Sequence, residues 1–187
     1  MKKTVKLILT ASLILAVFVA VIFIARSLSN NPQLLEFVAG LGYFGVTFIA
    51  IVSGLNAFIP VPAATFTPIF LEAGMVLPLI ILFLVLGTLI ADFLSFILGR
   101  VSREVVISKY PKTFDFVTKL QKNHRGLIIP VVIIYASVVP FPNEALLIPL
   151  ALSGIKFKTL IIPLIIGNTI YQTVIIYGVN GLLSLFT

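Results

Sequence analysis

A few acidic and amide side chains inside otherwise apolar sequence are the residues of this chain that could do chemistry. Asp92 is the sharpest of them, because it interrupts an apolar segment about six residues before that segment ends. Acids within membrane segments are costly and usually face a bundle interior or a water-filled path. On a helix Asp92 would share one face with Thr88 and Ser95. We expect Asp92 to belong to a substrate or proton pathway, and the alternative is a structural hydrogen bond to another helix.

Glu144 is the second acidic candidate, two residues after Pro142. Asn143 can cap a helix that starts here, and a carboxylate in the first turn suits the helix dipole. The functional alternative is a titrating group that couples transport to protons. Asn168 and Gln172 lie one helical turn apart in a later apolar segment, and we expect both to line the same cavity as Asp92.

The remaining candidates surround these acids in the sequence. Asn56 could supply a neutral donor near Pro60 and Pro62. Arg100 and Arg103 follow the segment of Asp92 and are the candidate phosphate contacts, with a membrane-surface anchor as the alternative for both. Broken helices whose N-termini point at the bilayer midplane also create a favourable site for an anionic group.

The candidates belong to a sequence that repeats itself. Four residues that interrupt helices recur 80 positions later: Pro60, Pro62, Gly74 and Gly87 correspond to Pro140, Pro142, Gly154 and Gly167. Thr88 stands at the same offset from Asn168. Asp92 corresponds in the same way to Gln172. Paired interruptions by Gly and Pro in two halves of a hydrophobic chain indicate a transport site built by two internal repeats. The alternative is that Pro and Gly are simply common in membrane helices.

Composition sets the class of protein. The chain has 187 residues, of which 60% are hydrophobic and 10% charged, and its mean hydropathy is +1.22. Soluble domains carry about 25% charged residues, so this is an integral membrane protein. The absence of cysteine excludes disulfides and thiolate sites, and no Walker-type, HExxH or GxSxG motif occurs. We therefore expect neither an enzyme nor a bound metal or cofactor, and the net charge of +7 reflects topology rather than nucleic-acid binding.

Segment lengths predict an all-α membrane fold. Residues 7–25 are long enough to span a hydrocarbon core of about 30 Å as an N-terminal transmembrane helix, with a cleaved signal peptide as the alternative. A helix start is plausible at Asn31-Pro32. The arm from Ala63 to Gly74 has 12 residues and would reach about 18 Å, too short to cross. We therefore expect two re-entrant hairpins with the proline pairs at their tips, the second entering over 127–139 and leaving over 143–154. Full spans are expected over 75–98 and from 160 to about 179.

The distribution of Lys and Arg predicts how these segments are oriented in the membrane. The N-terminus, the 99–126 loop and the turn at Lys156 and Lys158 fall on one side, which carries 12 of the 13 Lys and Arg residues and leaves Arg26 opposite. The positive-inside rule makes that side the cytoplasm, so the two repeats are predicted to be inverted. We expect a helix and linker over 1–39 and a transport domain over 40–187, with repeats at 40–98 and 127–180. Glu72 is expected near the outer interface.

The loop between the repeats is strongly basic. Residues 100–125 hold seven basic and two acidic side chains. The spacing of Phe114, Val117 and Leu120 is typical of an amphipathic helix on an anionic leaflet surface, and an ordinary positive-inside loop is the alternative.

The order of these motifs is similar to the DedA superfamily, also called VTT or SNARE-associated Golgi proteins. The resemblance rests on residues 58–65 (FIPVPAAT), 72–74 (EAG), Gly87, 96–100 (FILGR), Arg125-Gly126 and the segment from Pro140 to Gly154, and it covers roughly residues 40–177. It implies two opposed re-entrant hairpins and a role in moving lipids across membranes, such as undecaprenyl phosphate or phospholipids.

The chain departs from that family at three places. Many bacterial members have acids where this chain has Leu55 and Ala64, and an arginine shortly before the second proline pair, where this chain has Tyr135. Glu144 is the candidate substitute for a missing acid.

These observations predict a lipid transporter or scramblase in a prokaryotic plasma membrane, with membrane lipids as its partners and a homo-oligomer left open. Phosphate-headed lipids are the expected cargo. The alternatives are a proton-coupled transporter of a small solute or ion, working through Asp92 and Glu144, and a non-transporting membrane scaffold.

Overall fold

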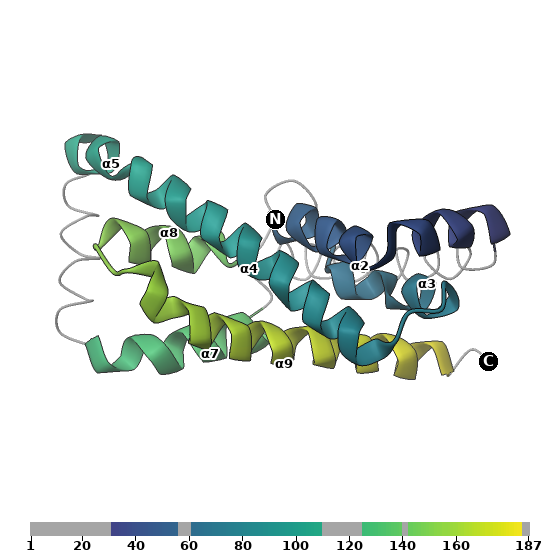
Figure 1. Ribbon diagram of the computed structural model, residues 1–187. Coiled ribbons are helices and arrows are strands. Elements are labelled where there is room, and N and C mark those ends of the chain that lie inside the picture. The colour runs from purple at the N-terminus through teal and green to yellow at the C-terminus, as the bar shows by residue number, and fades with distance from the viewer. Residues whose placement is uncertain (1–30, 56–60, 110–124, 140–141, 185–187) are drawn as a thin grey trace, which may run out of the picture.

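The computed structural model describes residues 31–55, 61–109, 125–139 and 142–184, and every element in those ranges is a helix (Figure 1). Three of these helices are long and apolar enough to cross a membrane: α2 (Pro32–Gly54), α4 (Leu77–Val101) and α9 (Phe157–Ser184). The expected class of all-α, multi-pass membrane protein is therefore confirmed. The predicted N-terminal helix, most of the basic loop, Asn56, Pro60 and Pro140 lie outside the described residues.

Helix α2 begins where the sequence predicts and is broken near its middle. The Asn31 side chain accepts hydrogen bonds from the backbone N–H groups of Gln33 and Leu34, at 3.0 and 3.2 Å, and Pro32 occupies the first position. Gly42 interrupts the helix at φ 54° and ψ −148°, a conformation that other residues rarely adopt. The part of α2 after Gly42, residues 43–54, reaches only about 18 Å.

The segments that follow the proline pairs are short, as predicted. After Pro62 the chain forms a 3₁₀ helix, η1 (Ala63–Phe66), and then α3 (Thr67–Glu72). In the second half α7 (Ile128–Val138) precedes the proline pair and α8 (Glu144–Leu152) follows it. Each outgoing arm ends in the same turn, with Gly74 at φ 84° and Gly154 at φ 88°. Their backbone N–H groups donate to Leu71 O and Ala151 O, which also stand 80 positions apart.

Two long helices cross at the centre of the molecule and run in opposite directions (Figure 1). They are α4 and α9, and they confirm the spans expected over 75–98 and from 160 onward. The shorter helix α5 (Arg103–Lys109) follows α4, and the 3₁₀ turn η2 (Arg125–Leu127) precedes α7. We call α2, η1, α3 and α4 the first unit, and α7, α8 and α9 the second unit.

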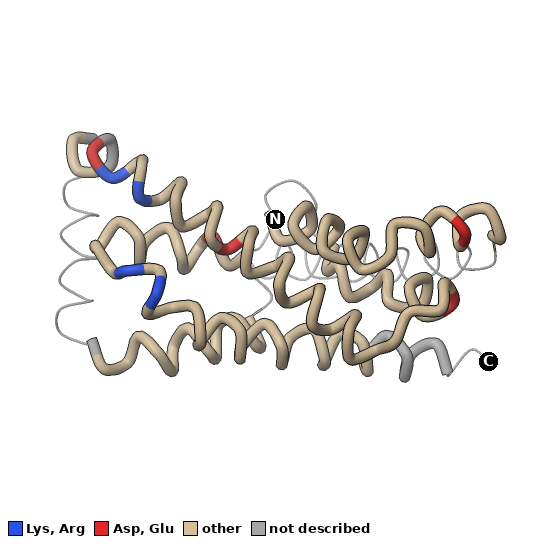
Figure 2. Tube along the Cα trace, in the orientation of Figure 1, with Lys and Arg blue, Asp and Glu red and all other residues tan. Residues whose placement is uncertain are grey.

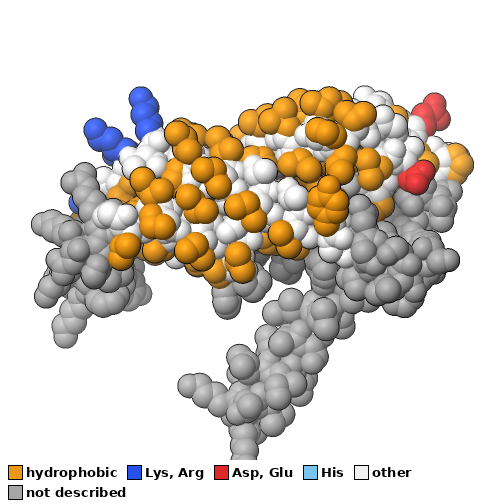
Figure 3. Space-filling model, turned by 90° about the horizontal axis from the view of Figure 1, so that it is seen from below, with side chains coloured by type: hydrophobic (Ala, Val, Ile, Leu, Met, Phe, Trp, Pro, Cys, Tyr) orange, Lys and Arg blue, Asp and Glu red, His pale blue; other side chains and the backbone are white. Residues whose placement is uncertain are grey.

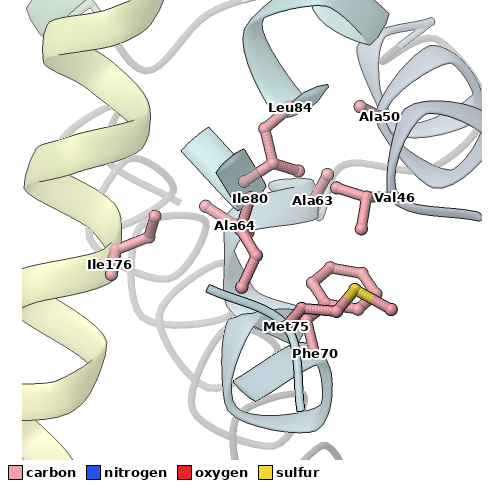
Figure 4. Close-up of a cluster of buried hydrophobic side chains, with 9 residues drawn as sticks. All are labelled: Val46, Ala50, Ala63, Ala64, Phe70, Met75, Ile80, Leu84 and Ile176. Carbon is pink, nitrogen blue, oxygen red and sulfur yellow. The ribbon is translucent and has the colours of Figure 1, made fainter. Parts of the chain in front are cut away.

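Each unit has its own hydrophobic core, and five of the nine residues in the first core have counterparts in the second. The first, shown in Figure 4, combines residues of α2, η1, α3 and α4. Three pairs lie 80 positions apart: Met75/Ile155, Ile80/Leu160 and Leu84/Leu164. Two further pairs lie 86 positions apart: Val46/Val132 and Ala50/Ala136. Each core also takes one residue from the long helix of the other unit, Ile176 in the first and Phe96 in the second. The long helices therefore tie the two cores together.

Glycines allow the closest helix contacts. A Cβ added at Gly87 would lie 2.5 Å from Ala50 Cβ and 2.5 Å from Thr47 O on α2. A Cβ at Gly167 would lie 2.6 Å from Ala136 Cβ and 3.0 Å from Ile133 O on α7. In lipid, helix association depends on such close packing rather than on hydrophobic exclusion from water. Gly87 on α4 and Gly167 on α9 thus lie on helix-packing surfaces.

Apart from Asp92 and Glu144, the charged residues lie at the two ends of the described structure. Arg100, Arg103, Lys156 and Lys158 lie at the end where α4 meets α5 and α8 turns into α9, which we call the basic end (Figure 2). Glu36 on α2 and Glu72 on α3 lie at the opposite end, and Glu72 is exposed as expected. Between the two ends, hydrophobic side chains cover the face shown in Figure 3. The pattern is that of a molecule whose long axis crosses a bilayer.

Candidate functional site

The predicted polar residues meet where α4 crosses α9. Asp92, which is 2% exposed, receives two hydrogen bonds there. Asn168 Nδ2 on α9 donates to Asp92 Oδ2 at 2.8 Å, and Asn143 Nδ2 at the start of α8 donates to Asp92 Oδ1 at 2.9 Å. Asn143 Nδ2 also donates to Asn168 Oδ1, at 3.3 Å. One carboxylate therefore joins α4, α9 and the tip of the second hairpin.

A second polar pair lies one turn away at the same crossing. Gln172 Nε2 on α9 donates to Thr88 Oγ1 on α4 at 3.1 Å, and the Thr88 hydroxyl donates to Leu84 O at 2.9 Å. The contacts are reciprocal, because Thr88 corresponds to Asn168 and Asp92 to Gln172. Asp92 thus bonds to Asn168, the counterpart of Thr88, and Thr88 bonds to Gln172, the counterpart of Asp92. A two-fold related interface has this pattern, in which residue i contacts j and j contacts i.

Burial makes the Asp92 network costly to break. Hydrogen bonds to a charged group contribute about 1.5–3 kcal/mol, and a buried charge left without partners costs more than the bonds contribute. The structural alternative for Asp92, a hydrogen bond to another helix, is therefore confirmed, and its part in a substrate or proton pathway stays a prediction.

Glu144 is differently placed. Both of its carboxylate oxygens are buried, and neither has a hydrogen-bond partner in the described part of the chain. It lies close enough to Asp92 to interact with it electrostatically. Among the described residues, two further buried side-chain atoms have no partner, Gln172 Oε1 and Thr65 Oγ1. Buried polar groups are normally satisfied, so atoms like these call for an explanation such as a ligand, an ion or water.

The predicted cap at Asn143 is wrong. Its side chain makes no capping bond to α8 and turns instead to Asp92 and Asn168. Asn143 is therefore the functional candidate that sequence reasoning missed. Its place directly after the second proline pair was a usable signal, because a residue at a hairpin tip faces whatever the tip approaches.

None of the hydrogen bonds of this network involves the other predicted residues that the structure describes. Tyr135 donates its hydroxyl to Pro142 O at 3.2 Å and so connects the two arms of the second hairpin, while Pro62 precedes η1. Arg100 and Arg103 stay at the basic end and do not join Asp92, and Arg103 Nε donates to Leu152 O at 3.1 Å. Within the described ranges no group of three or more His, Cys, Asp and Glu side chains could hold a metal ion.

Comparisons of the chain with protein-family models, with curated proteins and with solved structures find no significant match.

Proposed function

We propose that this protein moves phosphate-headed lipids across a membrane through two inverted repeats, each with a re-entrant hairpin, as the resemblance to the DedA superfamily implies. The observation that carries the proposal is the buried polar crossing of α4 and α9, which the tip of the second hairpin reaches through Asn143. Transport sites of inverted-repeat membrane proteins are built near the bilayer midplane from discontinuous helices of this kind.

The reciprocal contacts support the inverted repeat. Asp92 with Asn168 and Thr88 with Gln172 are the pairs that a two-fold axis between α4 and α9 requires. In this proposal the axis lies between the antiparallel helices α4 and α9, across the long axis of the molecule (Figure 1). In a bilayer the axis would lie in the membrane plane, so the two units would have opposite topologies.

The short arms support re-entrance. Residues 43–54 of α2 and the nine residues of α8 reach about 18 and 14 Å, about half of a hydrocarbon core or somewhat more. Irregular backbone at that depth is tolerated only where it is buried in protein or lines a polar cavity. The first hairpin would enter from the acidic end and the second from the basic end, with the basic end cytoplasmic by the positive-inside rule.

A lipid headgroup can use this arrangement while its acyl chains stay in the bilayer. The exterior between the two ends is apolar, the centre is polar, and Arg100 at the basic end is exposed to receive a phosphate. The site would work by binding and release, and we place it in a prokaryotic plasma membrane with the N-terminus in the cytoplasm. The second candidate is proton-coupled transport of a small solute, favoured by the unpartnered carboxylate of Glu144 next to Asp92.

Reconstitution tests the proposal. The purified chain in liposomes should make a phosphate-headed lipid with a fluorescent acyl chain accessible to an external quencher faster than protein-free vesicles do. Asp92→Asn should slow this by about tenfold or more, equivalent to 1.4 kcal/mol of barrier, while the matched control Glu72→Gln at the exposed end of α3 should not change it. Lipid movement at the protein-free rate, together with proton-dependent uptake of a water-soluble solute, would establish the second candidate instead.

A further inference from the structure

The centre of the site has a surplus of hydrogen-bond acceptors. Three of the four buried side-chain atoms without partners in the described structure are acceptors only: Glu144 Oε1, Glu144 Oε2 and Gln172 Oε1. Gln172 is 3% exposed, and its amide nitrogen already bonds to Thr88, so its free oxygen is fixed in place at the α4–α9 crossing. Carboxylate and amide oxygens donate nothing, so a ligand that satisfies them must bring N–H or O–H donors.

The charge at the crossing is negative. Asp92 and Glu144 are both there, whereas Arg100, the nearest described cation along α4, lies eight residues from Asp92 and therefore about 12 Å along the helix axis. The two donors that Asp92 receives come from neutral amides. A headgroup whose only charge is a phosphate would thus meet like charge at the centre, and a headgroup that also carries a positive group would not.

We infer that the lipid this site selects carries a primary ammonium group beyond its phosphate, as a phosphoethanolamine headgroup does; this inference rests on the lipid transport proposed above. A primary ammonium is positive, has three N–H donors and has no acceptor, so it matches the unpaired oxygens in both charge and hydrogen bonding. A trimethylammonium group has the charge without the N–H donors, and a glycerol headgroup has donors without the charge. The order of preference is therefore ethanolamine first, with choline and glycerol behind it.

The test compares headgroups on one acyl-labelled lipid. Full-length protein is reconstituted in liposomes, and the rate of exposure to the quencher is measured for phosphatidylethanolamine, phosphatidylcholine and phosphatidylglycerol carrying the same fluorescent acyl chain. We expect the ethanolamine lipid to move about tenfold faster than the other two, the ratio that one charge-assisted hydrogen bond supplies. Glu144→Gln should lower the ratio of the ethanolamine rate to the choline rate toward one.

The controls separate this inference from the proposed function. Glu72→Gln removes an acid at the exposed end of α3 and should keep the full preference. Equal rates for the three headgroups, or a fastest phosphatidylglycerol, would overturn the ammonium inference while lipid transport stands. A Glu144→Gln protein that keeps the ethanolamine preference would overturn it too. Protein-free rates for every headgroup would end both proposals.

Discussion

The two hairpin tips occupy corresponding places and have opposite chemistry. At the second tip Asn143 and Glu144 approach Asp92, and Asn143 bonds to it directly. The residues 80 positions earlier are Ala63 and Ala64, which lie in a hydrophobic cluster with Ile176, one turn beyond Gln172 on α9 (Figure 4). The first tip is thus packed, whereas the second is polar and incompletely satisfied. We infer that the first hairpin anchors the structure and the second carries the chemistry.

This difference also explains the free oxygen of Gln172. Its counterpart Asp92 receives a donor from Asn143, but the residue that corresponds to Asn143 in the first unit is Ala63, which has no donor to give. The two tips therefore differ at two corresponding positions, Ala63 against Asn143 and Ala64 against Glu144. Three of the four buried unpartnered atoms in the described structure lie at the crossing and the second tip, and the fourth, Thr65 Oγ1, lies in η1 of the first hairpin.

The largest effect on stability should come from placing a glutamate at Ala64, the position of the first tip that corresponds to Glu144. Ala64 is 0% exposed within the hydrophobic cluster. Ala64→Glu would bury a carboxylate without a partner and lower the free energy of unfolding by about 3–5 kcal/mol, whereas Glu144→Ala should leave it nearly unchanged. Thermal denaturation in detergent, followed by far-UV circular dichroism, measures both. Equal tolerance of Ala64→Glu and Glu144→Ala would remove the distinction between anchor and functional tip.

The next effect separates the charge of Asp92 from its hydrogen bonds. Asp92→Leu leaves the amide of Asn168 without its acceptor and removes one of the two acceptors of the Asn143 amide, so it should destabilise the protein by about 3 kcal/mol or more. Asp92→Asn keeps the size and one acceptor oxygen, so its cost should be about 1–2 kcal/mol, yet it should slow lipid movement as strongly as Leu does. A folded Asp92→Asn protein that transports at the normal rate would show that the residue is structural.

Much of this organisation was predictable from the sequence, for reasons that differ by residue. The turns at Gly74 and Gly154 were predictable because only glycine adopts their positive φ readily. The short arms follow from the number of residues between these glycines and the prolines. Asp92, Asn168 and Gln172 stand out because polar residues are rare in apolar spans. The bonding of Asn143 was not predictable, because the same residue type caps helices, and only the three-dimensional approach of the tip to α4 decides between the two roles.

A smaller effect compares the packing glycines of the two units. Gly87→Ala would force a methyl against a backbone oxygen at 2.5 Å, whereas at Gly167 the corresponding backbone oxygen is 3.0 Å away. We expect both substitutions to destabilise, by about 1–3 kcal/mol, with Gly87→Ala the more costly because its added methyl meets the closer backbone oxygen. Gly40→Ala, at a helical position with nothing within 4 Å, is the control. A larger cost at Gly167 would argue against the first unit as the better-packed half.

The smallest effect distinguishes the two polar pairs at the crossing. Gln172→Met removes an amide whose oxygen already has no partner and whose nitrogen bonds only to Thr88. The Thr88 hydroxyl keeps its own bond to Leu84 O, so no donor becomes unsatisfied and the loss should stay below about 1 kcal/mol. Asn168→Met, by contrast, deprives the buried Asp92 carboxylate of a donor and should cost about 2 kcal/mol or more. The denaturation midpoints of the two variants measure which substitution lowers stability more. If Gln172→Met were the more damaging, Gln172 would have a partner in the working protein, and its free oxygen would no longer mark the place of a ligand.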